Sequence, residues 1–185
     1  VTDLKTVVSI NGDYSRRNYT VFDIQSLKGQ RQLTKTLPFT VEDAAAAEAA
    51  GIDTLNVRHD PSRPEIARDI RRAAPLTFMT FAMPMQAASS KSEALKICFE
   101  ALELGADSIM CGSWSLDFIE AVANAGIPVE GHVGLVPRKS TWTGGLRAVG
   151  KTKAQAEKLY NEIRLLENIG AWAVEVEVIP YNIMK

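Results

Sequence analysis

The chain has 185 residues, of which 46% are hydrophobic and 23% are charged, which is enough apolar material for one sizeable core. Its formal net charge of −1 argues against binding to nucleic acid or to an anionic membrane, since both favour a basic surface. The sequence contains no apolar run near the roughly 20 residues that span a bilayer. Two cysteines are too few for a disulfide framework, so we expect a cytoplasmic protein.

The chain is predicted to contain an N-terminal arm and a single domain. The arm covers residues 1–20 and the domain covers residues 21–185. After a short helix over 21–28, the predicted strands cover residues 32–36, 54–58, 76–81, 108–111, 128–131 and 173–178. The predicted helices between these strands cover residues 41–50, 64–73, 91–104, 115–125 and 152–169. Thr40 and Asp43 fit a capping box at the start of the first of these helices.

Glycine marks four of the junctions between these elements. Gly51, Gly105, Gly126 and Gly170 each follow a segment with helical apolar periodicity and precede a β-branched or apolar run. Glycine closes helices because it adopts the left-handed conformation without steric cost. Helices that alternate with strands in this way predict an α/β fold with a parallel sheet.

Six predicted strands are compatible with two α/β architectures. An open doubly wound sheet fits the length, because a closed (β/α)8 barrel typically needs about 250 residues. An open sheet, however, gathers its functional loops near one switch point. Polar residues here recur at the ends of the second, fifth and sixth strands, as in a ring. We therefore predict a (β/α)8 TIM-type barrel with about six βα units in this chain, incomplete at its C-terminus.

The segment over residues 125–152 is the strongest functional signal. A short apolar strand ends in Glu130 and His132, and a long loop with glycines and basic residues follows. Polar side chains at the carboxyl end of a strand, before a long loop, are typical of barrel active sites. Alternate residues of a strand share one face, so Glu175 and Glu177 on the sixth strand point together as well. We therefore predict that the protein is an enzyme.

The two histidines of the chain, His59 and His132, both lie at carboxyl ends of predicted strands. Two imidazoles with a carboxylate suit a transition metal better than the all-oxygen shell of Mg²⁺. The alternatives are structural: His59 as a loop residue paired with Asp60, and His132 as a buried histidine with satisfied hydrogen bonds. Glu130 and Glu175 can equally be solvated or paired with basic residues of neighbouring elements.

Three segments carry a resemblance to a known family. GHVGLVP at Gly131–Pro137, GGLRAVGKT at Gly144–Thr152 and VEVIP at Val176–Pro180 resemble ketopantoate hydroxymethyltransferases of the phosphoenolpyruvate mutase/isocitrate lyase barrel superfamily. The resemblance implies a (β/α)8 barrel, a cytoplasmic homo-oligomer and a divalent metal, usually Mg²⁺. It also implies transfer of a hydroxymethyl group from methylenetetrahydrofolate to a 2-oxo acid, through an enolate, in pantothenate biosynthesis.

The resemblance also implies roles for single residues. His132 matches the histidine of the family site and Glu177 its proton-transfer carboxylate, so both are predicted to be catalytic. Arg138 and Arg147 are assigned from the residues themselves: they lie on the long basic loop after the fifth predicted strand, and such a loop over a barrel mouth can hold a carboxylate. Together with Asp60, they are predicted to bind the substrate. His59 falls on the position of a metal-binding aspartate, which makes it the predicted metal ligand.

Other positions depart from the family pattern. Ala82 replaces a second metal-linked aspartate, Met110 a substrate-binding lysine, and Gly112 the glutamate that follows this lysine. Two further readings therefore stay open: a 2-oxo-acid lyase or decarboxylase of the same superfamily, and a non-catalytic paralogue that kept the barrel without the metal site. The metal is Mg²⁺ by resemblance, or a transition metal if His59 binds it.

Overall fold

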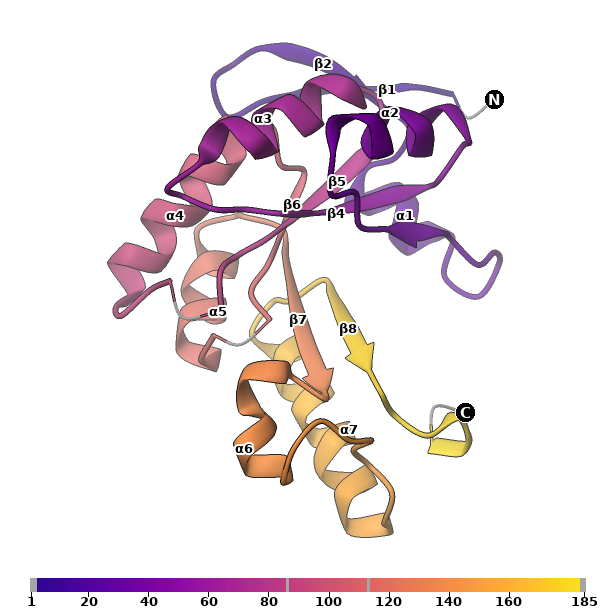
Figure 1. Cartoon of the computed structure of the whole chain (residues 1–185), viewed down its shortest axis with the longest axis vertical. Helices are drawn as coiled ribbons and strands as arrows, with labels where there is room; N and C mark the ends of the chain where they lie inside the picture. Colours follow the sequence, from indigo (N-terminus) through magenta and orange to yellow (C-terminus); the bar gives the residue numbers. More distant parts are fainter. Residues whose placement is uncertain (1–2, 86, 113, 184–185) are drawn as a thin grey trace. The chain divides into compact units, whose positions relative to one another are not determined.

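The computed structural model describes residues 3–85, 87–112 and 114–183 (Figure 1). The chain divides into two compact units. Unit 1 comprises Val1–Pro84 and Lys96–Ile109, and unit 2 comprises Met85–Leu95 and Met110–Lys185. Within the described residues, strands β3 to β8 follow one another in a six-stranded sheet in the same order as along the chain. The predicted separation into an arm over 1–20 and a domain over 21–185 stays a prediction.

Unit 1 begins with a hairpin that the sequence analysis did not anticipate. Strands β1 (Lys5–Val8) and β2 (Tyr14–Arg17) pair antiparallel where we expected a loose arm. The turn closes through two backbone hydrogen bonds, from Ser9 N to Asp13 O at 2.9 Å and from Gly12 N to Ser9 O at 2.9 Å. Gly12 adopts a positive φ of 84° there, which lets the chain reverse tightly. The hairpin leads into helix α1 (Val21–Ser26).

The remaining elements of unit 1 alternate as predicted. Strand β3 (Lys35–Thr36) pairs with β4 (Thr54–Arg58), and β4 pairs with β5 (Phe78–Ala82), both in parallel. Helix α2 (Val41–Ala49) starts at Thr40 with the predicted capping box, and α3 (Pro64–Ala73) matches its predicted range. Helix α4 (Lys91–Glu103) and strand β6 (Ser108–Met110) contain residues of both units. The strands supply the most deeply buried apolar side chains, among them Leu55, Val57, Phe78, Met79 and Phe81.

A buried charge network ties the start of β6 to other parts of unit 1. The Asp107 carboxylate accepts hydrogen bonds from Arg17 Nε at 2.8 Å, from Arg71 Nη1 at 3.0 Å and from the Met79 amide at 2.9 Å. Burial lowers the pKa of Arg71 to about 10, because it penalises the charged guanidinium, while Asp107 acts in the opposite direction. The carboxylate is therefore the counter-ion of two buried guanidinium groups.

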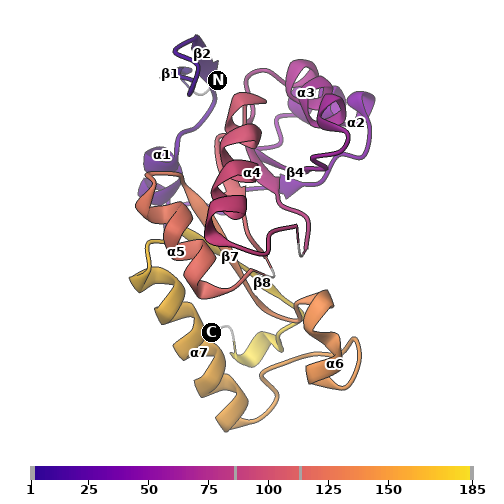
Figure 2. The ribbon, with the colours of Figure 1, turned by 90° about the vertical axis from the view of Figure 1, so that its left-hand side faces the viewer.

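Unit 2 is built around two neighbouring strands and the helices beside them. Strands β7 (Val129–Gly134) and β8 (Ala173–Glu177) pair in parallel. Helix α7 (Lys153–Asn168) runs alongside both strands in two perpendicular views (Figures 1 and 2). The long loop between β7 and α7 contains a 3₁₀ turn, η1 (Pro137–Lys139), and a short helix, α6 (Ser140–Thr143). Helix α5 (Leu116–Asn124) precedes β7, and a second 3₁₀ turn, η2 (Tyr181–Ile183), follows β8.

Strand β7 is longer than predicted, and this difference bears on function. The sequence predicts a strand over 128–131, whereas the pairing with β8 continues as far as Gly134 opposite Glu177. His132 therefore lies inside the paired strand and not in the following loop. The extension follows from the ladder itself, because β8 offers backbone partners along the whole of this range.

The helix ends follow the predicted glycine pattern. Gly51, Gly105, Gly126 and Gly170 all have positive φ, between 75° and 99°, as closure of a helix by glycine requires. Among the residues that the structure describes, no helix has both the length and the apolarity needed to cross a membrane.

Candidate active site

The carboxyl ends of β7 and β8 bring two predicted catalytic residues together. In the ladder, His132 is opposite Glu175, and Gly134 is opposite Glu177. Glu175 and Glu177 are two residues apart on one strand and so share a face. The Nε2 atom of His132 lies 3.0 Å from Oε2 of Glu177, and the two side chains are 4% and 33% exposed. The histidine is thus buried beside a carboxylate that reaches solvent.

His132 and Glu177 approach each other closely without forming a hydrogen bond. The 3.0 Å separation is within ion-pair distance. His132 Nε2 is nevertheless without a hydrogen-bond partner among the described residues. A buried ring nitrogen in this situation retains its capacity to bind a proton, a substrate oxygen or a cation.

Glu175 completes a group of three possible metal ligands with His132 and Glu177. One ligand atom from each residue can be chosen so that all three lie within 4.8 Å of one another. Within residues 3–85, 87–112 and 114–183, this is the one such group of three or more histidine, cysteine or acidic side chains. One imidazole and two carboxylates form a donor set that fits a divalent cation. His132, Glu175 and Glu177 therefore have the chemistry of a divalent metal site.

Two backbone hydrogen bonds hold the chain at Glu177 and Val178. The Leu135 amide donates to its carbonyl oxygen at 2.9 Å, and the Val149 amide donates to the carbonyl oxygen of Val178 at 3.1 Å. Val178 has a φ of +48°, a left-handed conformation that is strained for a β-branched residue. Strained residues of this kind persist only where surrounding contacts impose them, and they concentrate at functional sites. The position of Glu177 is therefore determined by tertiary contacts.

Gly134 lies so close to Glu177 that no side chain fits between them. A Cβ atom at this glycine would overlap the carbonyl oxygen of Glu177, and the glycine has a φ of +88°. We predict that Gly134→Ala lowers the free energy of unfolding by about 2–4 kcal/mol, from left-handed strain and from overlap with the backbone. Urea denaturation measures this loss.

Gly126→Ala is the matched control for this substitution. Gly126 has a similar φ of +79°, but a Cβ atom there would meet no other atom within 4 Å. Only the conformational penalty of about 1 kcal/mol is expected for this variant. Equal losses in the two variants would show that the approach of Gly134 to Glu177 is unimportant.

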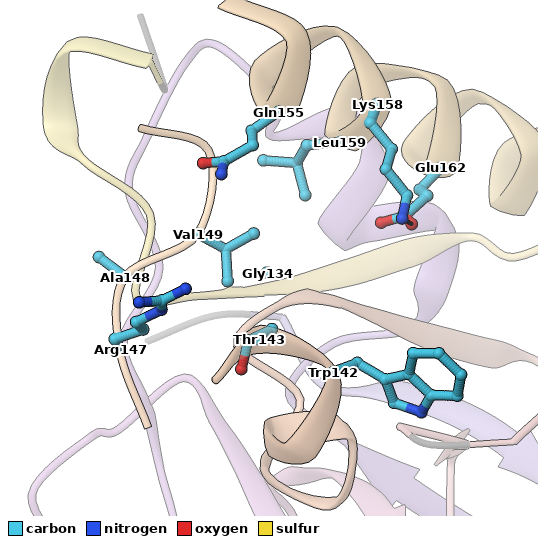
Figure 3. Close-up of a pocket in the computed structure, with 10 residues that line it drawn as sticks. All are labelled: Gly134, Trp142, Thr143, Arg147, Ala148, Val149, Gln155, Lys158, Leu159 and Glu162. Atoms are coloured by element: carbon cyan, nitrogen blue, oxygen red, sulfur yellow. Dashed lines mark ion pairs between the residues drawn. The ribbon is translucent and has the colours of Figure 1, made fainter. Parts of the chain in front are cut away.

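The loop after β7 forms a pocket of about 240 Å³ beside this strand end. Its lining includes Gly134, Val149 and Leu159, together with Trp142 and Arg147. Figure 3 shows Trp142 and Arg147 on different sides of the pocket. Both side chains are exposed, as is Arg138 in η1. The structure thus places Arg147 in a concave site next to Gly134, whereas Arg138 is outside the lining of this pocket.

The other two predicted site residues, His59 and Asp60, belong to unit 1. His59 is buried, its ring lies 6.2 Å from that of Phe81, and neither ring nitrogen has a hydrogen-bond partner among the described residues. Burial lowers the pKa of His59 by disfavouring the imidazolium, and the negative charges of Glu100 and Asp60 oppose this effect. The side chain is therefore neutral near neutral pH. Its role as a metal ligand stays a prediction.

The Asp60 carboxylate is already engaged by its own loop. It accepts hydrogen bonds from the Ser62 hydroxyl at 2.6 Å, from the Ser62 amide at 2.9 Å and from Arg63 Nε at 3.2 Å. These bonds lower the pKa of Asp60 because they stabilise the carboxylate, and the bond from the Ser62 hydroxyl has the largest effect. The bonds stabilise a turn before α3. The assignment of Asp60 to substrate binding stays a prediction.

Sequence reasoning did not select Glu175 or explain Gly112. Acidic residues that alternate along a strand are usually solvated, so Glu175 gave a signal only through its two-residue spacing from Glu177. Its position opposite His132 depends on the register of β7 with β8. At Gly112, a Cβ atom would lie 3.0 Å from Nδ1 of His132, so glycine lets the backbone approach the imidazole.

The sequence is similar to known enzymes over most of its length. Residues 19–185 match the family described as ketopantoate hydroxymethyltransferase. A 3-methyl-2-oxobutanoate hydroxymethyltransferase of Thermus thermophilus is 31% identical over 185 residues, covering 90% of this chain and 70% of that protein. An enzyme of the same name from Pyrobaculum arsenaticum is 34% identical over 119 residues, covering 63% of this chain and 45% of that protein.

Solved structures of distant proteins share the fold. A 2,3-dimethylmalate lyase, described as a phosphoenolpyruvate mutase/isocitrate lyase superfamily member, has a TM-score of 0.57 at 13% identity, covering 86% of this chain and 64% of that chain. This likeness confirms the predicted α/β fold of the barrel type. The match of residues 19–185 confirms the resemblance that the loop and strand motifs indicated. The chain belongs to the ketopantoate hydroxymethyltransferase family.

Proposed function

We propose that the protein is a transferase that adds a hydroxymethyl group to a 2-oxo acid in an aldol-type reaction. The observation that carries the proposal is the pair of His132 and Glu177 at adjacent strand ends, in a chain of this family. A buried imidazole and a partly exposed carboxylate at this position supply the groups that enolisation needs. The relatives named after this reaction support the same substrate class.

Glu177 acts as the proton-transfer residue in this proposal. Its carboxylate takes the proton from C3 of the oxo acid, and the electrons of the broken C–H bond pass into the enolate. Hydrolysis of the one-carbon donor, methylenetetrahydrofolate, breaks its two C–N bonds and gives formaldehyde and tetrahydrofolate. C3 then forms a carbon–carbon bond to the formaldehyde carbon, the C=O π electrons move to oxygen, and this oxygen takes up a proton to become the hydroxyl group. His132 faces the same space and contacts the substrate oxygen through Nε2, which has no hydrogen-bond partner among the described residues. A divalent metal ion held at these strand ends, where Glu175 and Glu177 offer carboxylate ligands, would polarise the keto group.

The carboxylate of the oxo acid needs a cationic partner, and we assign Arg147 to this role. A guanidinium group can bind a carboxylate through two parallel hydrogen bonds. Arg147 lines the pocket beside Gly134, whose backbone neighbours that of Glu177. We also assign substrate contacts to Arg138 and Asp60, on the sequence alone.

Several finer assignments extend the proposal. The one-carbon donor is methylenetetrahydrofolate and the pathway is pantothenate biosynthesis, as the resemblance implies. We further propose a homo-oligomer in the cytoplasm. Cys98 and Cys111, which are both buried and unbridged, are consistent with a reducing compartment.

Hydrogen exchange at carbon tests the function directly. The protein is incubated in D₂O with 3-methyl-2-oxobutanoate and a divalent metal salt, and proton NMR follows loss of the C3 signal. We expect enzyme-dependent exchange, and formation of the hydroxymethylated acid when methylenetetrahydrofolate is added. Release of CO₂ or cleavage of a longer oxo acid without transfer would favour a lyase or decarboxylase. Absence of exchange with any small 2-oxo acid would leave a non-catalytic paralogue.

A further inference from the structure

His132 has a buried ring nitrogen without a hydrogen-bond partner among the described residues. The side chain of His132 is 4% exposed, and its Nε2 has no hydrogen-bond partner in the described part of the chain. In native proteins such an atom commonly faces an ion or a ligand, because leaving it unsatisfied loses its hydration without compensation. The nearest charged atom is Glu177 Oε2, at 3.0 Å. The nitrogen is therefore directed at an acidic group.

Two carboxylates converge on this nitrogen from the neighbouring strand. Glu175 is paired with His132 in the register of β7 and β8, and Glu177 follows two residues later on the same face. Each of the three side chains has one ligand atom, and these atoms all lie within 4.8 Å of one another. Two carboxylates at this separation repel each other, and one imidazolium can balance only one of them. A divalent cation balances both.

We propose that His132, Glu175 and Glu177 bind one divalent transition-metal ion. Two ligands on one such ion lie roughly 3–3.5 Å apart, given metal–ligand bonds of roughly 2.0–2.2 Å. The His132–Glu177 separation of 3.0 Å already has this spacing. Mixed imidazole and carboxylate ligands favour Mn²⁺, Fe²⁺, Co²⁺ or Zn²⁺ over Mg²⁺, which prefers an all-oxygen shell. The ion has a route to solvent through Glu177, because one-third of this side chain is exposed.

This site differs from the one that the family resemblance implies. Glu175 lies outside the segment Val176–Pro180 that carries the resemblance. At the implied metal positions, Ala82 offers no ligand atom, and His59 is not part of a three-ligand group among the described residues. The metal site is relevant to catalysis only if the proposed function holds. It changes the role that the proposed function gives to His132. His132 Nε2 contacts the cation rather than the substrate, while the second oxygen of Glu177 stays available for proton transfer.

Metal affinity tests the inference independently of activity. Apo-protein is titrated with Co²⁺ alone, and the d–d absorption bands report ligand type and stoichiometry. We expect one Co²⁺ per chain, with a spectrum typical of mixed nitrogen and oxygen ligands. Glu175→Gln and His132→Gln should each weaken binding by at least about 10–100-fold, the range seen even for outer-shell partners. Circular dichroism checks that each variant is folded, and Glu175→Gln is the safer one because this side chain is only partly buried.

Two matched controls make the outcomes distinct. Glu157→Gln removes an exposed carboxylate on α7 and should bind Co²⁺ like the wild type. His59→Gln removes the other histidine and should also keep the affinity. Loss of binding in His59→Gln together with wild-type affinity in Glu175→Gln would overturn the inference, as would absence of Co²⁺ binding to the folded wild type. C3 exchange with unchanged metal affinity in Glu175→Gln contradicts the metal site alone. Metal binding that depends on Glu175 without any exchange contradicts the proposed function alone.

Discussion

Replacing Glu177 by glutamine is expected to reduce C3 exchange and hydroxymethyl transfer by about 10²–10⁴-fold, the usual contribution of a positioned proton-transfer group. Glutamine has nearly the same shape but cannot accept a proton at neutral pH. The Glu177 side chain is one-third exposed and its backbone is held by Leu135, so the fold should be retained. The assay uses a saturating divalent metal salt, so that weaker ligation by glutamine does not contribute to the loss. The loss should then appear in kcat and should not require any change in KM for the oxo acid. Proton NMR in D₂O and steady-state kinetics measure the two quantities.

Glu157→Gln is the control for this loss of activity. It removes the same charge from an exposed position on α7, where Glu157 lies 3.8 Å from Lys153. Exchange by Glu157→Gln should equal that of the wild type. If Glu177→Gln also exchanges deuterium at the wild-type rate, Glu177 is not the proton-transfer residue, and the assignment must move to another group at the strand ends.

The largest expected effect on stability comes from Asp107. Asp107→Asn removes the counter-ion of Arg17 and Arg71, and its amide group cannot accept all of the hydrogen bonds that the carboxylate accepts. Breaking a buried ion pair at one partner typically costs about 3–5 kcal/mol, because the remaining charge stays buried. For a chain of this size we expect the Tm to fall by about 6–20 °C. Differential scanning calorimetry measures the change.

Asp69→Asn is the control variant, because it removes one partner of a solvent-exposed ion pair. Asp69 lies 3.6 Å from Arg72 on α3, and both side chains are exposed. Such pairs contribute at most about 1 kcal/mol, so the Tm should change by no more than a few degrees. Similar effects of the two substitutions would show that the Asp107 network does not stabilise unit 1.

The sequence was sufficient for the order of the elements and for their local boundaries. Periodicity located α3 and β4 at their observed ranges, and the capping box at Thr40 was visible as residue types at the correct spacing. These features are local, because a helix face or a cap depends on residues within four positions of each other. The hairpin over residues 5–17 escaped this reasoning, since its short strands lack a clear apolar alternation.

The candidate site was only partly accessible from the sequence. Motifs indicated His132 and Glu177, because residues at strand ends followed by a glycine-rich loop are recognisable without a structure. Glu175 was not selected, because its significance comes from a partner about forty residues earlier in the chain. Whether a strand residue is opposite a histidine or one position away is decided by register, and a shift of one residue would move its side chain to the other face.

The amino-acid sequence by itself therefore determined the alternation of strands and helices, the glycine-closed helix ends and the family. Each of these depends on short-range sterics or on short motifs. Only the tertiary structure decided that His132 meets Glu175 and Glu177, that Gly134 lies against the backbone of Glu177, and that Arg17 reaches Asp107. These contacts join residues far apart in the chain. Their geometry depends on strand register and packing, which hydrophobic periodicity does not encode.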